Sequence, residues 1–282
     1  MHKIVRKKTL SDENFLIEIH APQVAERFLP GQFVIIRIHE KGERIPLTVA
    51  DVDPKEDTIT LVFQVVGKTT MELSSLKEGG TLLNVVGPLG NPSEIENFGR
   101  VICVGGGTGI ACIYPIVKAL SGAGNEVHAI IGARTASLLI LEDEIRRASS
   151  DIHITTDDGS KGHHGFVTDV LKKLIKKFKN KGGVDLVMVI GPPVMMQAAA
   201  EVTRPFGIKT VASLNTIMID GTGMCGGCRL FVNGEMKLAC IDGPEFDAHK
   251  VNFRDVISRL SMFEEKEKMA VAHHKKCLRG KK

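Results

Sequence analysis

Hydrophobic residues in the first third of the chain follow the spacing of short β-strands. Apolar and polar residues alternate over 15–19, and the segments 33–38 and 58–66 are rich in β-branched residues. Clusters of glycine, proline and aspartate separate these segments, as turns between strands require. Short strands at this spacing predict a closed antiparallel β-barrel over residues 1–97.

The pattern changes near residue 97, where short apolar runs begin to alternate with amphipathic segments. The runs expected to form strands are 100–104, 127–131, 152–156 and 186–190. The segments expected to form helices are 113–120, 137–148 and 168–179. This alternation predicts a parallel sheet covered by helices on both faces, which we assign to residues 98–217.

Two further segments complete the chain. Residues 218–245 combine closely spaced cysteines with glycines, and residues 246–282 are charged and compatible with a helix. The predicted fold class is therefore β plus α/β: an antiparallel barrel, a parallel-sheet domain, a C-terminal cysteine module and a helical tail.

The composition narrows the functional classes. The 282 residues are 43% hydrophobic and 25% charged, and the small net charge of +4 does not indicate a nucleic-acid partner. No run of about 18 apolar residues predicts a membrane-spanning helix, and the first residues lack the apolar stretch of a signal peptide. We therefore expect a cytoplasmic protein that binds neither nucleic acid nor membrane.

Three of the six cysteines have the spacing of metal ligands. Cys225 and Cys228 form a Cys-x2-Cys pair, and eleven residues separate Cys228 from Cys240. The plant-type [2Fe–2S] pattern has another cysteine five residues before this pair, where Asp220 stands here. The spacing favours a [2Fe–2S] cluster held by Asp220 and the three cysteines, with zinc as the alternative metal. For Asp220, the alternative is a turn residue beside the site.

A glycine-rich loop follows the first strand of the predicted parallel sheet. It reads Gly105-Gly106-Gly107-Thr108-Gly109-Ile110 and opens a helix. Backbone N–H groups at such a turn face an anion, so the loop predicts a site for a dinucleotide pyrophosphate. The loop lacks the third glycine of the Gly-x-Gly-x-x-Gly fingerprint, and the second strand lacks the expected acidic residue. An ordinary Rossmann dehydrogenase therefore does not fit.

Six motifs follow one another along the chain: Pro30-Gly31-Gln32-Phe33, Arg44-Ile45-Pro46-Leu47-Thr48, Gly67-Lys68-Thr69-Thr70, Gly87-Pro88-Leu89-Gly90, the glycine-rich loop, and Gly191-Pro192-Pro193-Val194-Met195. This ordered set resembles the ferredoxin–NADP reductase superfamily, whose members join a flavin-binding barrel to a nicotinamide-binding α/β domain. Their common order covers residues 1 to about 217. The resemblance implies FAD bound by the barrel and NAD(H) bound by the second domain.

The resemblance also implies roles for individual residues. Those expected to bind the flavin and its pyrophosphate are Arg44, Pro46, Leu47, Thr48, Val65, Val66, Lys68, Thr69 and Thr70. Those expected to bind the nicotinamide nucleotide are Gly106, Gly107, Thr108, Gly109, Arg134, Gly191, Pro192 and Met195. The alternative for Arg134 is a surface ion pair with Glu142 or Glu144. No catalytic protein residue is expected, because hydride transfer to flavin needs no protein acid.

Two carboxylates bear on the choice of nucleotide. Asp157 and Asp158 follow the third strand of the second domain, where they disfavour a second phosphate and can accept ribose hydroxyls. They favour NADH over NADPH. A helix N-cap is the alternative role for Asp158.

The order of flavin barrel, nicotinamide domain and [2Fe–2S] segment is similar to that of two families of electron-transfer subunits. One family serves dihydroorotate dehydrogenase and normally carries four cysteines. The other, the small subunits of NADH-dependent reduced ferredoxin:NADP oxidoreductases, resembles this chain in using aspartate for the first cysteine and in its helical extension. This resemblance implies a heterodimer with a larger flavin and [4Fe–4S] subunit, which performs electron bifurcation and reaches ferredoxin through that partner.

Two alternatives to this function remain open. The first is the electron-transfer subunit of dihydroorotate dehydrogenase, which uses the same chemistry with another partner. The second belongs to a different class, a zinc-stabilised nucleotide-binding regulator without redox activity.

Overall fold

The alternating apolar residues of the first third of the chain form the inside of a nearly closed barrel. The computed structural model describes residues 1–279. The barrel strands are β1 (His2–Thr9), β2 (Asn14–His20), β3 (Phe33–Arg37), β4 (Arg44–Asp53), β5 (Thr58–Gln64), β6 (Thr81–Leu82) and β7 (Asn84–Leu89). They run in the order β6-β1-β2-β5-β4-β3-β7, and every neighbouring pair is antiparallel. Only Leu83 separates β6 from β7 at the two ends of this order, which confirms the barrel prediction.

Alternation along the barrel strands divides their side chains between two surfaces. Ile17 and Leu61 are fully buried inside the barrel, beneath the short helices α1 (Pro22–Arg27) and α2 (Lys68–Ser75). Their neighbours Leu16 and Val62 point outward and join the apolar cluster around the first helix of the second domain. The outer surface of β2 and β5 therefore forms part of the seam between the two domains.

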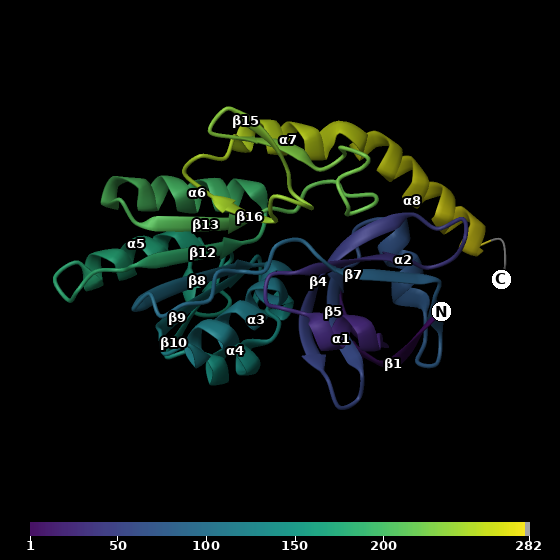
Figure 1. Cartoon of the computed structure of the whole chain (residues 1–282), viewed down its shortest axis with the longest axis horizontal. Coiled ribbons are helices and arrows are strands. Elements are labelled where there is room, and N and C mark those ends of the chain that lie inside the picture. Colours follow the sequence, from purple (N-terminus) through teal and green to yellow (C-terminus); the bar gives the residue numbers. More distant parts are fainter. Residues whose placement is uncertain (280–282) are drawn as a thin grey trace.

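The second domain is a seven-stranded sheet beside the barrel (Figure 1). Its strands are β8 (Arg100–Gly106), β9 (Glu126–Ala133), β10 (Asp151–Thr156), β11 (His163–His164), β12 (Leu186–Ile190), β13 (Lys209–Ser213) and β16 (Glu245–Asp247). Their order is β11-β10-β9-β8-β12-β13-β16, and every pair is parallel except β13 with β16. The predicted parallel sheet is confirmed. It has one additional antiparallel edge strand, β16, whose sequence contains no apolar run from which it could have been predicted.

Helices cover both faces of this sheet because both faces of its central strand are apolar. Val101 and Cys103 of β8 face α3 (Gly109–Gly122) and α4 (Glu142–Ala148), whereas Ile102 and Val104 face α5 (Val167–Phe178) and α6 (Pro193–Thr203). The predicted helix over 137–148 is divided into a 3₁₀ turn (Ala136–Leu138) and α4. The lysines of α5 lie on its exposed face, as its spacing predicts.

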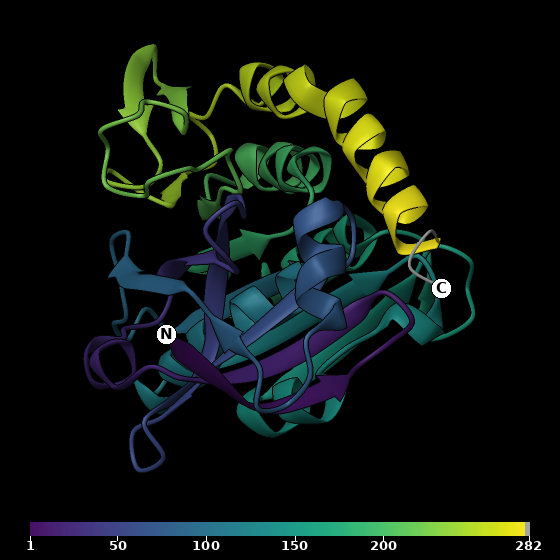
Figure 2. The ribbon, with the colours of Figure 1, turned by 90° about the vertical axis from the view of Figure 1, so that its right-hand side faces the viewer.

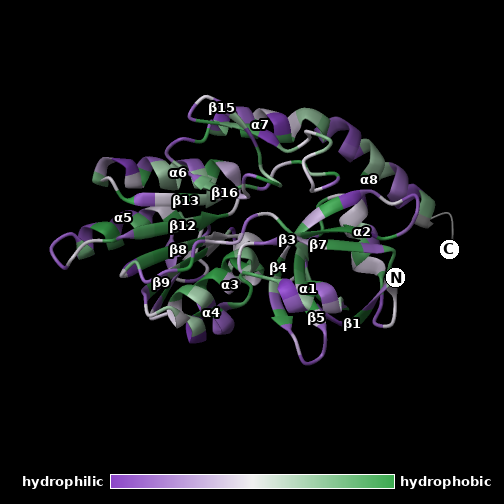
Figure 3. Cartoon of the chain, in the orientation of Figure 1, coloured by the Kyte–Doolittle hydropathy of each residue, from purple (hydrophilic) through white to green (hydrophobic). Residues whose placement is uncertain are grey.

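The last part of the chain crosses over both domains (Figures 1 and 2). The cysteine segment contains one hairpin, β14 (Arg229–Val232) with β15 (Glu235–Leu238). After β16, α7 (Phe253–Leu260) packs near α6, a 3₁₀ turn (Ser261–Phe263) follows, and α8 (Glu264–Arg279) runs to α2 of the barrel. There His274 Nδ1 lies 3.6 Å from Glu72 Oε1. Hydrophobic residues concentrate in the sheets, whereas α8 carries many hydrophilic ones (Figure 3). Among the described residues, no helix is long and apolar enough to cross a membrane.

Candidate nucleotide and cluster sites

A cavity of about 560 Å³ lies where the second domain meets the barrel. Parallel strands end together at the carboxyl edge of their sheet, which is where open α/β sheets bind ligands. The lining residues come from the ends of β8, β9, β10 and β12, from the helices that follow, and from the barrel: Asn14, Gln64, Gly106, Gly107, Thr108, Gly132, Ala133, Arg134, Leu138, Thr155, Asp157, Phe166, Val167, Thr168, Pro192, Val194, Met195 and Ala198. The topology therefore assembles one site from segments more than 180 residues apart.

The glycine-rich loop can occupy this edge only because it lacks side chains. A Cβ on Gly109 would lie 2.4 Å from the carbonyl oxygen of Ile190, and one on Gly106 would lie 2.3 Å from Met195 Sδ. Gly107 adopts a positive φ of 56°, which favours glycine. The loop thus packs directly on the turn after β12, and its open side faces the cavity.

Two polar side chains of the second domain reach the barrel across the cavity. Thr108 Oγ1 lies 3.3 Å from Asn14 Oδ1, and the Arg134 guanidinium donates to Glu13 Oε2 at 3.0 Å. The alternative ion pair of Arg134 with Glu142 or Glu144 does not form, since Glu142 is paired with Lys161 and Arg146. Arg134 is 65% exposed, so it lies at the mouth of the cavity and can turn toward a bound anion.

The two predicted carboxylates differ in position. Both are exposed, but Asp157 lines the cavity and Asp158 lies outside it. Hydrogen bonds from the hydroxyl and backbone N–H of Ser160 hold Asp158 in a turn and lower the pKa of its carboxyl. Asp158 is not a helix N-cap, because the next helix, α5, begins at Val167 with Asp169 in its capping box. Only Asp157 is placed to meet a nucleotide.

The residues expected to bind flavin lie along β4, at the end of β5 and at the start of α2. Pro46, Leu47 and Thr48 are half-buried on β4, and Arg44 is exposed at its beginning. Val66 is 74% exposed just before α2, while Val65 packs against the barrel core. This strip combines partly open apolar surface with a cation, which fits an aromatic ring system carrying phosphates.

The first turn of α2 offers backbone donors rather than free hydroxyls. Thr70 Oγ1 accepts the N–H groups of Val66 and Gly67, each at 3.0 Å, and Thr69 Oγ1 donates to Glu43. Lys68 lies 3.8 Å from Glu72. The anion-binding capacity of this segment therefore rests on the N-terminal N–H groups of the eight-residue helix and on Lys68.

The four predicted cluster ligands gather into two adjoining pairs. Cys225 Sγ lies 3.2 Å from Asp220 Oδ1, and Cys228 Sγ lies 3.2 Å from Cys240 Sγ. Backbone N–H groups point at the sulfurs, from Gly227 to Cys225 at 3.4 Å and from Cys240 to Cys228 at 3.5 Å. The first pair is partly or fully exposed and the second is buried.

The electrostatics of these donors fit a cation at their centre. Hydrogen bonds from Cys225 and Thr222 and the N–H of Met224 lower the pKa of Asp220 to about 2, so it is an ionised oxygen donor. Burial raises the pKa of Cys240 to about 12, because a second thiolate beside Cys228 is costly without a compensating positive charge. Positive φ angles at Gly221, Gly223 and Gly226 allow the loop to wrap this site. The donor set suits an iron–sulfur cluster with one carboxylate.

Comparisons with known proteins identify the relatives of this chain. An iron–sulfur cluster binding domain of dihydroorotate dehydrogenase B matches residues 215–252, and an oxidoreductase NAD-binding domain matches residues 103–201. The dihydroorotate dehydrogenase B electron-transfer subunit homolog of Thermotoga maritima is 51% identical over 96% of this chain and 94% of that protein. The chain belongs to the family of dihydroorotate dehydrogenase B electron-transfer subunits and their homologues.

Other members and neighbours of this family differ in how much they share. The dihydroorotate dehydrogenase B electron-transfer subunit of Bacillus caldolyticus is 32% identical over 88% of this chain and 96% of its own length. A solved structure of the NADH-dependent reduced ferredoxin-NADP oxidoreductase, described for its insights into flavin-based electron bifurcation, is 49% identical over 97% of both chains with a TM-score of 0.90. Amycolatopsis cytochrome P450 reductase, at 20% identity and a TM-score of 0.58, shares the fold. The protein is therefore an oxidoreductase subunit with an electron-transfer role, which implies a larger partner subunit.

Several cavity residues escape prediction from the sequence. Asn14 and Gln64 belong to the barrel, and nothing in their local sequence indicates that the second domain closes over them. Phe166, just before α5, also lines the cavity and is 63% exposed, and nothing in its local sequence indicates this position.

Proposed function

We propose that this chain is the electron-transfer subunit of an electron-bifurcating NADH-dependent ferredoxin:NADP oxidoreductase. In this proposal residues 1–97 bind FAD, 98–217 bind NAD(H), 218–245 hold a [2Fe–2S] cluster and 246–279 form a helical extension; the last three residues of the extension predicted for 246–282 lie outside the described residues. Electrons pass between these groups and a larger subunit with flavin and [4Fe–4S] clusters, which communicates with ferredoxin. Free cysteines suit a reducing compartment such as the cytoplasm.

The second domain binds and orients the nicotinamide nucleotide. Backbone N–H groups of Gly107, Thr108 and Gly109 at the start of α3 bind its pyrophosphate. Arg134 exchanges Glu13 for a nucleotide phosphate, and Asp157 accepts ribose hydroxyls. Gly191, Pro192 and Met195 shape the pocket for the nicotinamide ring at the seam with the barrel.

The barrel orients the flavin, which when bound exchanges a hydride with nicotinamide and single electrons with iron–sulfur clusters. Arg44, Lys68 and the first N–H groups of α2 bind its phosphates. Pro46, Leu47, Val65 and Val66 exclude water from its ring, and Thr48 donates a hydrogen bond to the ring.

The cysteine module binds the cluster through Asp220, Cys225, Cys228 and Cys240. An oxygen ligand in place of one thiolate changes the charge distribution at the exposed side of the site. Because Asp220 and Cys225 face solvent, that side is the one that meets the partner subunit. The module lies at the upper edge of the molecule in Figure 2. It contacts the barrel at Gly221, which packs on Ile35 and Leu89.

The observation that carries the choice of complex is the match of 97% of this chain to the ferredoxin-NADP oxidoreductase subunit at 49% identity. The dihydroorotate dehydrogenase subunit of Bacillus caldolyticus leaves more of this chain unmatched, since its alignment covers 88%. Aspartate at position 220 adds to this preference, because four-cysteine sites carry a thiolate there.

Isolation of the native complex tests the proposal. We expect a yellow-brown complex with a larger flavoprotein, in which NADH and reduced ferredoxin together donate the electrons that reduce NADP⁺, so that NADH oxidation requires both reduced ferredoxin and NADP⁺. Co-purification with a dihydroorotate-oxidising subunit would instead establish the alternative, and a colourless zinc protein would exclude both.

Replacement of Asp220 tests the ligand assignment separately. Asp220→Ala is expected to lower cluster content and alter the EPR spectrum, while Glu235→Ala, a carboxylate change on the nearby exposed hairpin, leaves both unchanged. An unaltered spectrum and full iron content in Asp220→Ala would remove Asp220 from the ligand set.

A further inference from the structure

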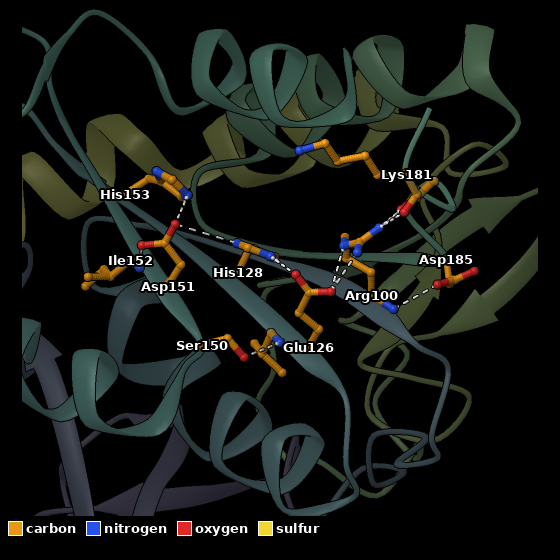
Figure 4. A network of polar contacts seen from close by, with 11 residues as sticks. Arg100, Glu126, His128, Ser150, Asp151, Ile152, His153, Lys181 and Asp185 are labelled. Atoms are coloured by element: carbon orange, nitrogen blue, oxygen red, sulfur yellow. Dashed lines mark hydrogen bonds and ion pairs between the residues drawn. The ribbon is translucent and has the colours of Figure 1, made fainter. Parts of the chain in front are cut away.

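A second cluster of metal-ligating side chains lies at the opposite edge of the parallel sheet, away from the nucleotide cavity (Figure 4). Asp151 and His153 alternate on β10, so their side chains share one face of the sheet. His128 of β9 is the direct register partner of Asp151 and contributes to the same face. One ligand atom from each of His128, Asp151 and His153 lies within 4.8 Å of the other two.

Two of these ligand atoms are buried without a hydrogen-bond partner. His128 Nδ1 and His153 Nε2 both have this property, and the His128 side chain is only 7% exposed. Both nitrogens face Asp151 Oδ2, at 3.9 Å and 3.2 Å, in geometries that make no hydrogen bond. A buried polar atom left without a partner costs free energy, so the arrangement calls for an occupant.

The surrounding groups orient these atoms toward a common point. Glu126 Oε1 lies 2.9 Å from His128 Nε2, and its carboxylate is held by the Arg100 guanidinium at 2.8 Å. An ionised Glu126 accepts the Nε2–H, which leaves the lone pair on Nδ1. The other oxygen of Asp151 accepts the backbone N–H of Ile152 at 2.9 Å. A carboxylate behind a histidine ligand is the usual support of a metal-bound imidazole.

We propose that His128, Asp151 and His153 bind a single divalent transition-metal cation of the Zn²⁺ class at the amino edge of the sheet. Two imidazole nitrogens and one carboxylate oxygen are a donor set that such cations accept, with the remaining position open to water. Asp151 is 47% and His153 is 24% exposed, which gives the ion a path from solvent. The bound cation joins β9 to β10 and is independent of the flavin, the cluster and the proposed electron transfer.

The local charges are compatible with a bound cation. Asp151 and Glu126 contribute two negative charges, Arg100 is already paired with Glu126, and Lys177 of α5 lies near His153. The competing arrangement is a doubly protonated His128 that bridges Glu126 and Asp151. The two arrangements differ in whether the site takes up metal at a pH above the ordinary histidine pKa.

Zinc uptake by the holoprotein distinguishes them. The protein, with flavin and cluster in place, is treated with a chelator, equilibrated with Zn²⁺ at pH 8 and passed through gel filtration before metal analysis and zinc-edge X-ray absorption. We expect one zinc ion per chain, with nitrogen and oxygen neighbours at about 2.0–2.1 Å. His128→Gln and His153→Gln are expected to lose at least about tenfold in zinc affinity, and Glu126→Gln about 10–100-fold.

Controls separate this site from other zinc-binding groups. His20→Gln removes an exposed histidine of the barrel and is expected to leave zinc uptake unchanged. Sulfur neighbours at about 2.3 Å would place the zinc among the cysteines and overturn the proposal. Equal zinc content in the wild type and His153→Gln would also overturn it, as would ¹⁵N NMR showing His128 doubly protonated with zinc present. X-ray absorption of the wild type decides the matter even if a variant folds poorly.

Discussion

The nucleotide cavity and the cysteine module are built in opposite ways. The cavity walls come from segments between Asn14 and Ala198, each fixed by a strand, a helix or the seam between domains. The module's four donors come from 21 consecutive residues, 220–240, whose regular structure is a single hairpin. The cavity is therefore a product of topology, whereas the module depends on loops that match an iron–sulfur cluster binding domain.

This difference determines how each region should respond to change. A cavity supported by packed strands is sensitive to added volume, because its atoms have nowhere to move. A loop-built site is sensitive to loss of a ligand, since metal binding contributes its folding energy. We therefore expect added volume to affect mainly the cavity, and loss of a ligand to affect mainly the module.

Removal of a buried cluster ligand is expected to have the largest effect. Cys228→Ser leaves Cys240 without its neighbour at 3.2 Å and should abolish most cluster iron. Iron analysis and EPR measure this loss, while reduction of bound flavin by NADH should continue at a rate within about twofold of wild type, because the cavity is formed independently. Cys277→Ser, on the exposed face of α8, is the matched control and should retain full cluster. Parallel loss of nucleotide binding in Cys228→Ser would show that the two regions are not independent.

Added volume in the glycine-rich loop is expected to act on the cavity alone. In Gly109→Ala the new Cβ meets the backbone oxygen of Ile190 at 2.4 Å, which should cost about 2–3 kcal/mol and lower Tm by roughly 5–10 °C. NADH affinity should fall as the loop shifts, and cluster content should not. Gly122→Ala lies at the last residue of the same helix, with no atom within 4 Å of its Cβ, and should leave stability within about 0.5 kcal/mol of wild type. Calorimetry compares the pair, and equal Tm values would refute the close-packing argument.

The cluster ligands and the glycine-rich loop could be predicted from the sequence, but some residues of the cavity could not. Cys225, Cys228 and Cys240 were predictable as a group because cluster ligation depends on short local spacing. The glycine-rich loop was predictable for the same reason, since it joins one strand to one helix. Asn14 and Gln64 were not, because their approach to the cavity results from how the barrel packs on α3 through Leu16 and Val62. Local periodicity carries no information about that packing.

The two edges of the parallel sheet also show that local sequence does not predict contacts made between strands. Thr155 near the end of β10 and Asp157 just after this strand line the cavity, while Asp151 at its start lies with His128 and His153. The pairing of His128 with Asp151 depends on the register of β9 against β10, which 22 intervening residues do not determine. A sequence read segment by segment therefore shows three ordinary polar residues, and only the sheet brings them together.

The stability of the fold at β16, just after the cysteine module, should depend on pH. Glu245 of β16 accepts a hydrogen bond from Ser93 Oγ at 2.5 Å, and burial raises the pKa of this carboxyl from 4.5 to about 7. Ionisation of Glu245 therefore destabilises the fold: the cost is full above pH 7, shrinks as the pH falls from 7 toward 4.5, and is absent below 4.5. Glu245→Gln should stabilise by on the order of 2 kcal/mol at pH 8. Urea unfolding at pH 8 and pH 4.5 measures both states, and an equal gain at the two pH values would exclude ionisation of Glu245 as the cause.

The smallest expected effect concerns Arg134, which lies at the mouth of the cavity. Arg134→Ala removes an exposed side chain whose present partner is Glu13, and exposed ion pairs contribute about 0–1 kcal/mol, so stability should hardly change. If Arg134 instead binds a nucleotide phosphate, KM for NADH should rise about three- to tenfold with kcat maintained, because the lost interaction is made equally in the ground and transition states. Asp158→Ala is the control, since its carboxylate is held by Ser160 outside the cavity and KM should stay within about 1.5-fold of wild type. A change in KM for Asp158→Ala as large as that for Arg134→Ala would mean that the nucleotide extends beyond the cavity over the turn after β10, and that Asp158 as well as Asp157 contacts it.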